Sequence, residues 1–187
     1  MADPIDPSAA HLFPGKGPEL RSAERVARLA FPQSLEASLE GISVQTVFDV
    51  GTGTGLFAQG FAALGLQVFA VDLRKDLLDQ AITFVPAGHF CIARAEGLPF
   101  PEGSADLVFM AVVLHEAADR LGVLREARRV ARQRVAILEW PYRSDGHGPP
   151  IEHRVPREAL MSGALTAGFS TVETRSFTGV DLYLLRP

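Results

Sequence analysis

Two spacings of apolar residues recur along this chain and predict an alternation of strands and helices. Short apolar runs between glycine or polar residues are typical of buried parallel strands, whereas apolar residues three or four positions apart indicate one face of a helix. The long apolar run 105–113 is predicted to be a central strand. The predicted strands are 46–50, 67–72, 89–93, 105–113 and 134–140, and the predicted helices are 56–64, 75–84, a segment capped by Asp119, and 157–167.

The two ends of the chain depart from this alternation. The first eighteen residues hold four prolines and two glycines and are expected to form an irregular arm. Apolar spacing then predicts one helix over about 18–30 and a short second helix over 34–39. At the other end, residues 171–185 are expected to form two strands that turn at Thr178-Gly179.

Together these elements predict an α/β fold. It is a doubly wound, mostly parallel seven-stranded sheet with helices on both faces and an antiparallel C-terminal strand. We expect residues 1–40 to form an N-terminal arm and helices, and residues 41–187 to form one ligand-binding domain.

Composition narrows the class of protein. The chain has 187 residues, 47% apolar content and a net charge of −4, which suits a globular domain and gives no general reason to bind nucleic acid. Its single cysteine, Cys91, rules out an internal disulfide, and no run of 18 apolar residues predicts a membrane span. The acidic, proline-containing start does not read as a secretory signal, so a cytoplasmic protein is expected.

The strongest chemical signal is the segment Asp49-Val50-Gly51-Thr52-Gly53-Thr54-Gly55, called here the glycine loop. It lies between a predicted strand and a predicted helix, where glycines let the backbone turn tightly and approach a ligand. A dinucleotide site requires G-x-G-x-x-G, but Leu56 or Ala58 occupies the third glycine position, and no phosphate-binding P-loop motif is present. A glycine-rich turn that binds nothing is the alternative.

A second acid follows at the end of the next predicted strand. Asp72 lies 21 residues after Gly51, where a carboxylate can accept hydrogen bonds from both hydroxyls of a ribose. The alternative for Asp72 is a helix cap or a solvated strand end.

These motifs, an acid before G-x-G-x-G and then Asp72, resemble those of class I S-adenosylmethionine-dependent methyltransferases. Residues 93–109 and Leu114-His115-Glu116-Ala117 continue the resemblance, which covers roughly residues 45–140 and is similar in particular to the ubiquinone and menaquinone biosynthesis branch. It implies S-adenosylmethionine as cofactor. The implied cofactor-binding residues are Asp49, Gly51, Thr52, Gly53, Thr54, Gly55, Asp72, Leu73, Ala95, Glu96 and Ala111.

One position departs from the family. Members often carry an acid just before the position of Ala95, where it meets the adenine amino group, and this chain has Arg94 there. Glu96 is the nearby acid that could take over this contact.

Methyl transfer from a sulfonium needs chiefly alignment, and a base only when the acceptor loses a proton during attack. His115 and Glu116 follow the central strand and are the two candidates for that base; for His115 a wall or capping role is the alternative. Trp140, Tyr142, Glu152 and His153 are expected to line the acceptor side or to pack there. Scattered histidines and one cysteine predict no metal site.

Three functions therefore remain. The first is methyl transfer to a small-molecule acceptor, the second a catalytically silent domain that binds the cofactor or a partner for regulation, and the third a nicotinamide-dependent oxidoreductase, which the glycine spacing disfavours. Only about fifteen residues separate Trp140 from the next predicted helix, too few for a large substrate cap. This implies an open site, a small acceptor, or a lid from the N-terminal arm or from a second subunit of a homo-oligomer.

Overall fold

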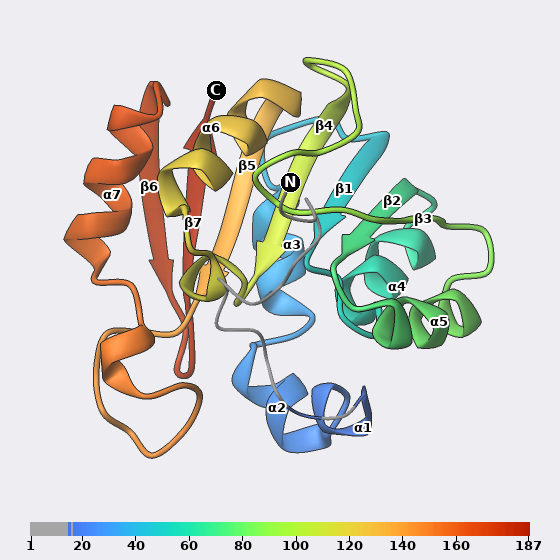
Figure 1. The fold of residues 1–187 in the computed structure, drawn as a ribbon, viewed down its shortest axis with the longest axis horizontal. Helices are drawn as coiled ribbons and strands as arrows, with labels where there is room; N and C mark the ends of the chain where they lie inside the picture. The colour runs from blue at the N-terminus through green and yellow to red at the C-terminus, as the bar shows by residue number, and fades with distance from the viewer. Residues whose placement is uncertain (1–14, 16) are drawn as a thin grey trace, which may run out of the picture.

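The computed structural model describes residue 15 and residues 17–187, and a seven-stranded sheet runs through it (Figure 1). The strand order is β3-β2-β1-β4-β5-β7-β6, so β4 lies at the centre between β1 and β5. The strands are β1 (Thr46–Val50), β2 (Gln67–Asp72), β3 (His89–Ile92), β4 (Ala105–Ala111), β5 (Ala131–Glu139), β6 (Thr171–Ser176) and β7 (Asp181–Arg186).

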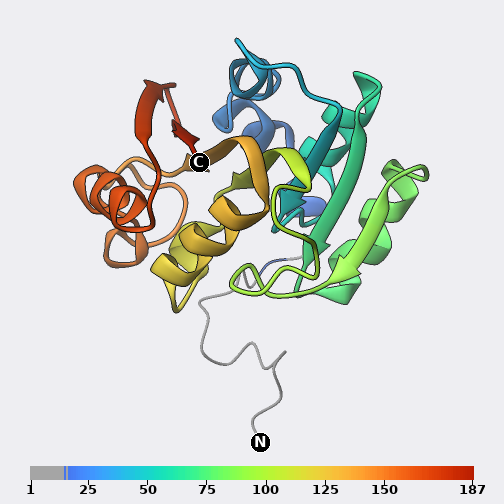
Figure 2. The same ribbon diagram turned by 90° about the horizontal axis from the view of Figure 1, so that it is seen from above.

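Helices cover both faces of this sheet (Figure 2). On one face α3 and α4 pack against the apolar side chains of β1, β4 and β7. On the other face α6 packs against β4 and β5, and α7 packs against α6 and β6. None of the helices in residues 17–187 is long and apolar enough to cross a membrane. The helices are α1 (Gly17–Leu20), α2 (Ala23–Arg28), α3 (Gln33–Leu39), α4 (Leu56–Ala63), α5 (Lys75–Phe84), α6 (Arg120–Val130) and α7 (Arg157–Thr166), with short 3-10 turns η2 (Leu114–Glu116) and η3 (Ile151–His153).

One strand runs against the others, as the sequence predicts. β7 pairs antiparallel with β5 and with β6, while β1, β2, β3, β4 and β5 are joined by parallel pairing. This confirms the predicted fold class. The carboxyl ends of the parallel strands therefore share one edge of the sheet, and α1 and α2 lie beyond that edge (Figure 1).

An aromatic cluster fixes α4 against the centre of the sheet. The ring of Phe109 on β4 lies 4.7 Å from that of Phe57 and 5.2 Å from that of Phe61, between ring centroids. All three side chains are buried. Aromatic pairs at such distances add to the stabilisation from burial, so the start of α4, which follows the glycine loop, is firmly placed.

Three predictions differ from the structure by more than one residue. The helix expected over 18–30 is two helices, because Ser22 leaves helical geometry and its hydroxyl accepts a hydrogen bond from the Arg25 amide, which starts α2. β4 ends at Ala111 rather than residue 113, because Val112 adopts a left-handed φ of 55°. β5 starts three residues earlier than expected, at Ala131.

The irregular arm expected over the first eighteen residues lies mostly outside the described residues. Where the structure describes this part, α3 belongs to the main core: Leu35 and Ala37 are buried with the side chains of α4 and β7. The division of the chain at residue 40 stays a prediction.

Candidate active site

A pocket opens at the carboxyl ends of β1, β2 and β4, the edge at which α/β sheets usually bind ligands. Its empty space, the part open to solvent included, is about 920 Å³. Most of its wall comes from the glycine loop, the end of β2 and the end of β4. The lining residues are Leu20, Arg25, Leu29, Asp49, Val50, Gly51, Thr52, Gly53, Thr54, Leu56, Phe57, Asp72, Leu73, Arg74, Leu77, Ala93, Ala95, Ala111, Val112, Val113 and Glu116.

The backbone of the glycine loop requires its glycines. Gly51, Gly53 and Gly55 have φ values of 71°, 54° and 77°, a region that side chains disfavour. A Cβ on Gly51 would also lie 2.2 Å from Cγ2 of Val113. The amides of Gly51 and Thr52 donate to the Val71 carbonyl at 2.7 and 3.0 Å, which ties the loop to β2.

Asp49, the acid that opens the loop, is buried and supports the loop from behind. Its Oδ2 accepts hydrogen bonds from the Thr52 hydroxyl at 2.6 Å and from the Ala58 amide at 3.1 Å. Burial raises the pKa of this carboxyl to about 7, although both hydrogen bonds favour its charged form. Asp49 therefore stabilises the join between loop and α4 as well as forming part of the pocket wall.

Asp72 forms the opposite wall at the end of β2. Its Oδ2 accepts from the Gly53 amide and its Oδ1 from the Arg74 amide, both at 2.8 Å. Burial raises the pKa of this carboxyl, while the two amides act in the opposite direction. The side chain is thus held in one orientation, with its carboxylate at the pocket surface, where hydroxyl groups of a ligand can reach it.

One polar atom in this wall has no partner. Thr54 Oγ1 is the buried side-chain oxygen or nitrogen that makes no hydrogen bond within the described residues. Leaving a buried hydroxyl unsatisfied costs about 1–3 kcal/mol, so such an atom in a pocket wall marks a place for a ligand group.

The α1–α2 segment closes one side of the pocket. Leu20, Arg25 and Leu29 line it, and Arg21 fastens the segment to the glycine loop. The Arg21 guanidinium donates to the Thr54 carbonyl at 2.7 Å and to Gln59 Oε1 at 2.9 Å, and lies 3.5 Å from the centroid of the Phe84 ring. Helical residues thus wall the site from the N-terminal side.

The polar side chains on the opposite side come from the ends of β4 and β5. Glu116 lines the pocket, and His115 lies behind it, 5% exposed. His115 Nδ1 is 2.9 Å from Oε2 of Glu139, and its Nε2 is 3.9 Å from Oε1 of Glu116. Glu139, at the end of β5, is 1% exposed.

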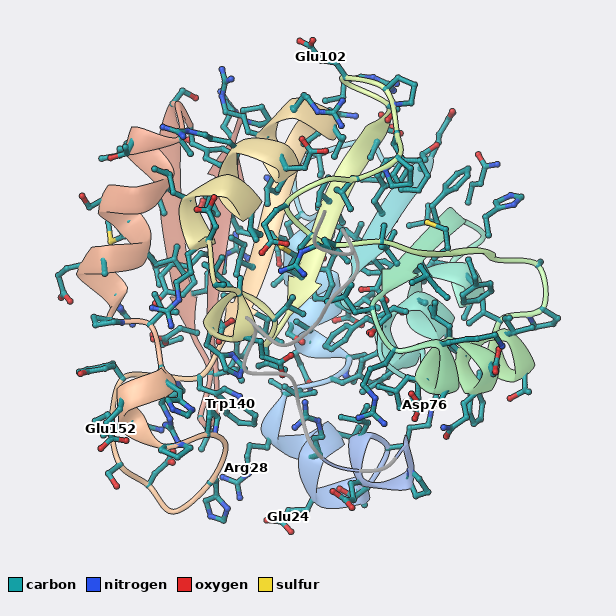
Figure 3. The ribbon with its side chains drawn as sticks, in the orientation of Figure 1. Glu24, Arg28, Asp76, Glu102, Trp140 and Glu152 are labelled. Carbon is teal, nitrogen blue, oxygen red and sulfur yellow. The ribbon has the colours of Figure 1, made fainter. Side chains whose placement is uncertain are left out.

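Trp140 follows Glu139 and is buried at the same edge, near α2 and far from Glu102 at the other end of the sheet (Figure 3). The Arg25 guanidinium, which lines the pocket, lies 5.7 Å from the Trp140 ring centroid. Trp140 therefore packs behind the pocket wall. Tyr142 is 52% exposed and belongs to the surface loop that follows.

Most of the predicted site residues come together in this pocket. Those that line it are Asp49, Gly51, Thr52, Gly53, Thr54, Asp72, Leu73, Ala95, Ala111 and Glu116. Gly55, Glu96 and His115 are outside the wall formed by the described residues. Gly55 is the N-cap residue of α4. Oε2 of Glu96 lies 3.5 Å from Nε of Arg94 in an ion pair, and the contact of Glu96 with an adenine stays a prediction.

The sequence reasoning missed Glu139 and the wall residues of α1 and α2. No local motif marks Glu139, because it contacts a histidine 24 residues away in the sequence. Arg74 was also missed, although it follows Asp72 closely. Within the described residues there is no group of three His, Cys, Asp or Glu side chains arranged to hold a metal.

Comparison with known proteins agrees with this geometry. Residues 48–138, about half of the chain, match the methyltransferase domain family. Over 94 residues the chain is 32% identical to malonyl-[acyl-carrier protein] O-methyltransferase of Serratia marcescens, covering 50% of this chain and 37% of that protein. Over 102 residues it is 33% identical to demethylmenaquinone methyltransferase of Thermotoga maritima, covering 52% and 44%. The chain thus spans less than half the length of these curated relatives.

The fold extends the likeness over nearly the whole chain. The structure superposes on that of an S-adenosylmethionine-dependent methyltransferase from Aquifex aeolicus with a TM-score of 0.78 and 22% identity, covering 93% of this chain and 98% of that one. The glycine loop, Asp72 and the domain match lie in the same part of the chain. The chain therefore carries a class I S-adenosylmethionine-dependent methyltransferase domain of the branch that includes the quinone methyltransferases, and S-adenosylmethionine is its cofactor.

Proposed function

We propose that this protein transfers the methyl group of S-adenosylmethionine to a small-molecule acceptor. The observation that carries the proposal is a single pocket lined by the glycine loop, by Asp72 and by the acid Glu116. The first two suit the cofactor, and the third supplies a polar group on the side where the strands β4 and β5 end. The names of two relatives give malonyl-[acyl-carrier protein] and demethylmenaquinone as acceptors of those proteins, and both give acceptor classes to test here.

The residues of the pocket fit the cofactor group by group. The Thr54 hydroxyl lacks a partner and can donate to the carboxylate of the methionine part. Asp72 is fixed by two backbone amides and can accept hydrogen bonds from ribose hydroxyls. Ala93 and Ala95 offer small apolar contacts for a flat base. S-adenosylmethionine contains no phosphate, which agrees with a loop that begins with Asp49, because a carboxylate there would repel a phosphate group.

Glu116 is the residue that we assign to the acceptor. When bound, S-adenosylmethionine supplies a methyl group already activated by its sulfonium, and the carbon–sulfur electron pair remains on sulfur. Glu116 accepts a hydrogen bond from the attacking O–H, N–H or C–H acid and takes its proton as the acceptor bonds to the methyl carbon. The surrounding wall aligns the acceptor, which supplies much of the acceleration.

Two variants test this assignment. The protein is incubated with S-adenosylmethionine labelled in its methyl group and with malonyl thioesters, quinones and fractionated metabolite pools. We expect wild type to label an acceptor, and Glu116→Gln to lower turnover by about a hundredfold or more while affinity for S-adenosylhomocysteine stays near wild type. The control is Glu152→Gln, an acid of η3 outside the pocket wall. Binding of S-adenosylhomocysteine without transfer to any acceptor would favour the silent regulatory domain instead.

A further inference from the structure

A buried acid stands behind the site without touching the pocket. Glu139 is 1% exposed, and its carboxylate accepts hydrogen bonds from the His115 amide at 3.1 Å and from the Trp140 amide at 3.2 Å, besides its contact with the His115 ring. A buried carboxylate is stable only when its oxygens are well satisfied. The end of β5 and the turn after β4 are therefore joined through this one side chain.

The same contact orients the imidazole. Because Nδ1 of His115 faces Oε2 of Glu139 at 2.9 Å, that nitrogen carries a hydrogen and donates a hydrogen bond to the carboxylate. The second nitrogen, Nε2, is thereby directed toward Oε1 of Glu116, 3.9 Å away. Three side chains then form a line from the core to the pocket: Glu139, His115 and Glu116.

Charges around the imidazole favour its protonated form. Burial lowers the pKa of His115, but the charges of Glu139 and Glu116 and the hydrogen bond to Glu139 outweigh burial, so the pKa lies above its usual value. Arg120 of α6 acts the other way. An imidazolium whose Nδ1–H donates to Glu139 and whose Nε2–H faces Glu116 at 3.9 Å has no lone pair with which to act as a base.

The neighbouring strand β7 supplies no charge that offsets the charge of Glu139 at His115. On β7 the carboxylate of Asp181 pairs with Arg157 at 2.9 Å, and Tyr183, whose pKa burial raises to about 12, is a neutral phenol near neutrality. The charge that faces His115 from β5 is therefore that of Glu139.

We propose that Glu139 is a positioning residue, which keeps His115 protonated and oriented so that the imidazolium holds the Glu116 carboxylate toward the acceptor. The inference rests on the proposed function, since it assigns a partner to the acceptor-facing acid. It makes His115 act through Glu116 rather than as the base. The active state is then the one in which His115 is charged, and activity falls as the pH rises through the pKa of this histidine.

The test is the variant Glu139→Gln, compared with wild type between pH 6 and 9. Loss of the carboxylate lowers the pKa of His115, so the alkaline decline in kcat/KM begins at lower pH. If the decline shifts by one pH unit, kcat/KM at pH 8 is about tenfold lower than in wild type. The NMR titration of the His115 ring must move in the same direction. Because that titration needs no acceptor, it separates failure of this inference from failure of the proposed function, which shows as absent methyl transfer by wild type.

Two further variants complete the design. Asp106→Asn alters another buried acid, 5% exposed, at the far end of β4, and should leave the pH profile unchanged. His115→Gln keeps a donor toward Glu116 without a titrating charge, so its lowered activity should not change with pH over this range. This variant keeps the proposal testable even if Glu139→Gln folds poorly. Activity of wild type that rises with pH through the His115 pKa would assign the imidazole as base and overturn the proposal. An unshifted profile and titration in Glu139→Gln would overturn it equally.

Discussion

The two halves of the pocket are built in different ways. At the ends of β1 and β2 the backbone carries the site: glycines with positive φ, amides that donate to Asp72, and a loop tied to Val71. At the ends of β4 and β5 the site consists of charged side chains, with Glu139 and His115 buried behind Glu116. The first half suits a ligand that never changes, the cofactor, whereas the second suits chemistry that differs between acceptors.

This difference predicts that substitutions in the two halves affect different measurements. Changes in the glycine loop or in Asp72 should lower cofactor affinity whatever the acceptor is. Changes behind Glu116 should alter turnover and its pH dependence with little effect on cofactor affinity. A variant of either half that produced the effect expected of the other would remove the distinction.

The largest effect is expected from Gly53→Val. The backbone at Gly53 has φ 54°, which is strongly unfavourable for a β-branched residue, and a Cβ there would lie 3.0 Å from Leu20. Calorimetry with S-adenosylhomocysteine should show affinity lowered by more than about 100-fold, equivalent to about 2.7 kcal/mol. Gly65→Val is the matched control, since Gly65 also has a positive φ, 80°, but has open space around it. Equal loss of binding in both variants would mean that backbone strain alone explains the effect.

A smaller loss is expected from Asp72→Ala. Removing a carboxylate that accepts hydrogen bonds leaves its partners unsatisfied, at a cost of about 1–3 kcal/mol, or roughly 5- to 150-fold in affinity for S-adenosylhomocysteine. Asp79→Ala removes an exposed acid of α5 that pairs with Lys75 and should bind as wild type. Wild-type affinity in a folded Asp72→Ala protein would show that the ribose lies elsewhere.

The smallest effect is expected on thermal stability, from substitution of Asp49, the buried acid that opens the glycine loop. The pKa of Asp49 is about 7 in the folded protein, so the folded state holds this proton more tightly than the unfolded state does. The contribution of Asp49 to the free energy of unfolding therefore falls as the pH rises from about 4 to 7. Asp49→Asn lacks this dependence, and its Tm should improve relative to wild type across that range.

Asp106→Asn gives the opposite sign in the same experiment. The pKa of Asp106 is lowered, because its backbone and Gln133 hydrogen bonds and the Arg132 charge outweigh burial. The contribution of Asp106 to the free energy of unfolding is present at neutral pH and is lost as the pH falls. The Tm of Asp106→Asn should therefore lie furthest below that of wild type near pH 7. Parallel Tm curves for wild type and Asp49→Asn would contradict the raised pKa of Asp49.

The same contrast explains how much could be predicted from the sequence. The positions of the strands followed from apolar spacing, because buried parallel strands are continuously apolar. The glycine loop was readable because a backbone that must adopt positive φ at Gly51 and Gly53 leaves little choice of residue. Asp72 was readable because its distance from the loop is set by one strand–helix–strand unit.

The other half could not be read in this way. The pairing of His115 with Glu139 depends on the contact of two parallel strands, β4 and β5, whose ends meet only in the folded sheet. The break at Ser22, which turns α2 toward the pocket, depends on one hydrogen bond that apolar spacing does not encode. The position of Arg25 in the pocket wall follows from the direction of α2 and could not be predicted either.

The fastening of α1–α2 by Arg21 also has a consequence for the rates of ligand exchange. The guanidinium holds the Thr54 carbonyl, Gln59 and the Phe84 ring together, so opening this side of the pocket breaks all three contacts in one event. Cofactor that arrives or leaves on this side of the pocket then passes through that opening step. An Arg21→Met protein should accordingly exchange cofactor faster in both directions, with a residence time that shortens far more than the Kd weakens.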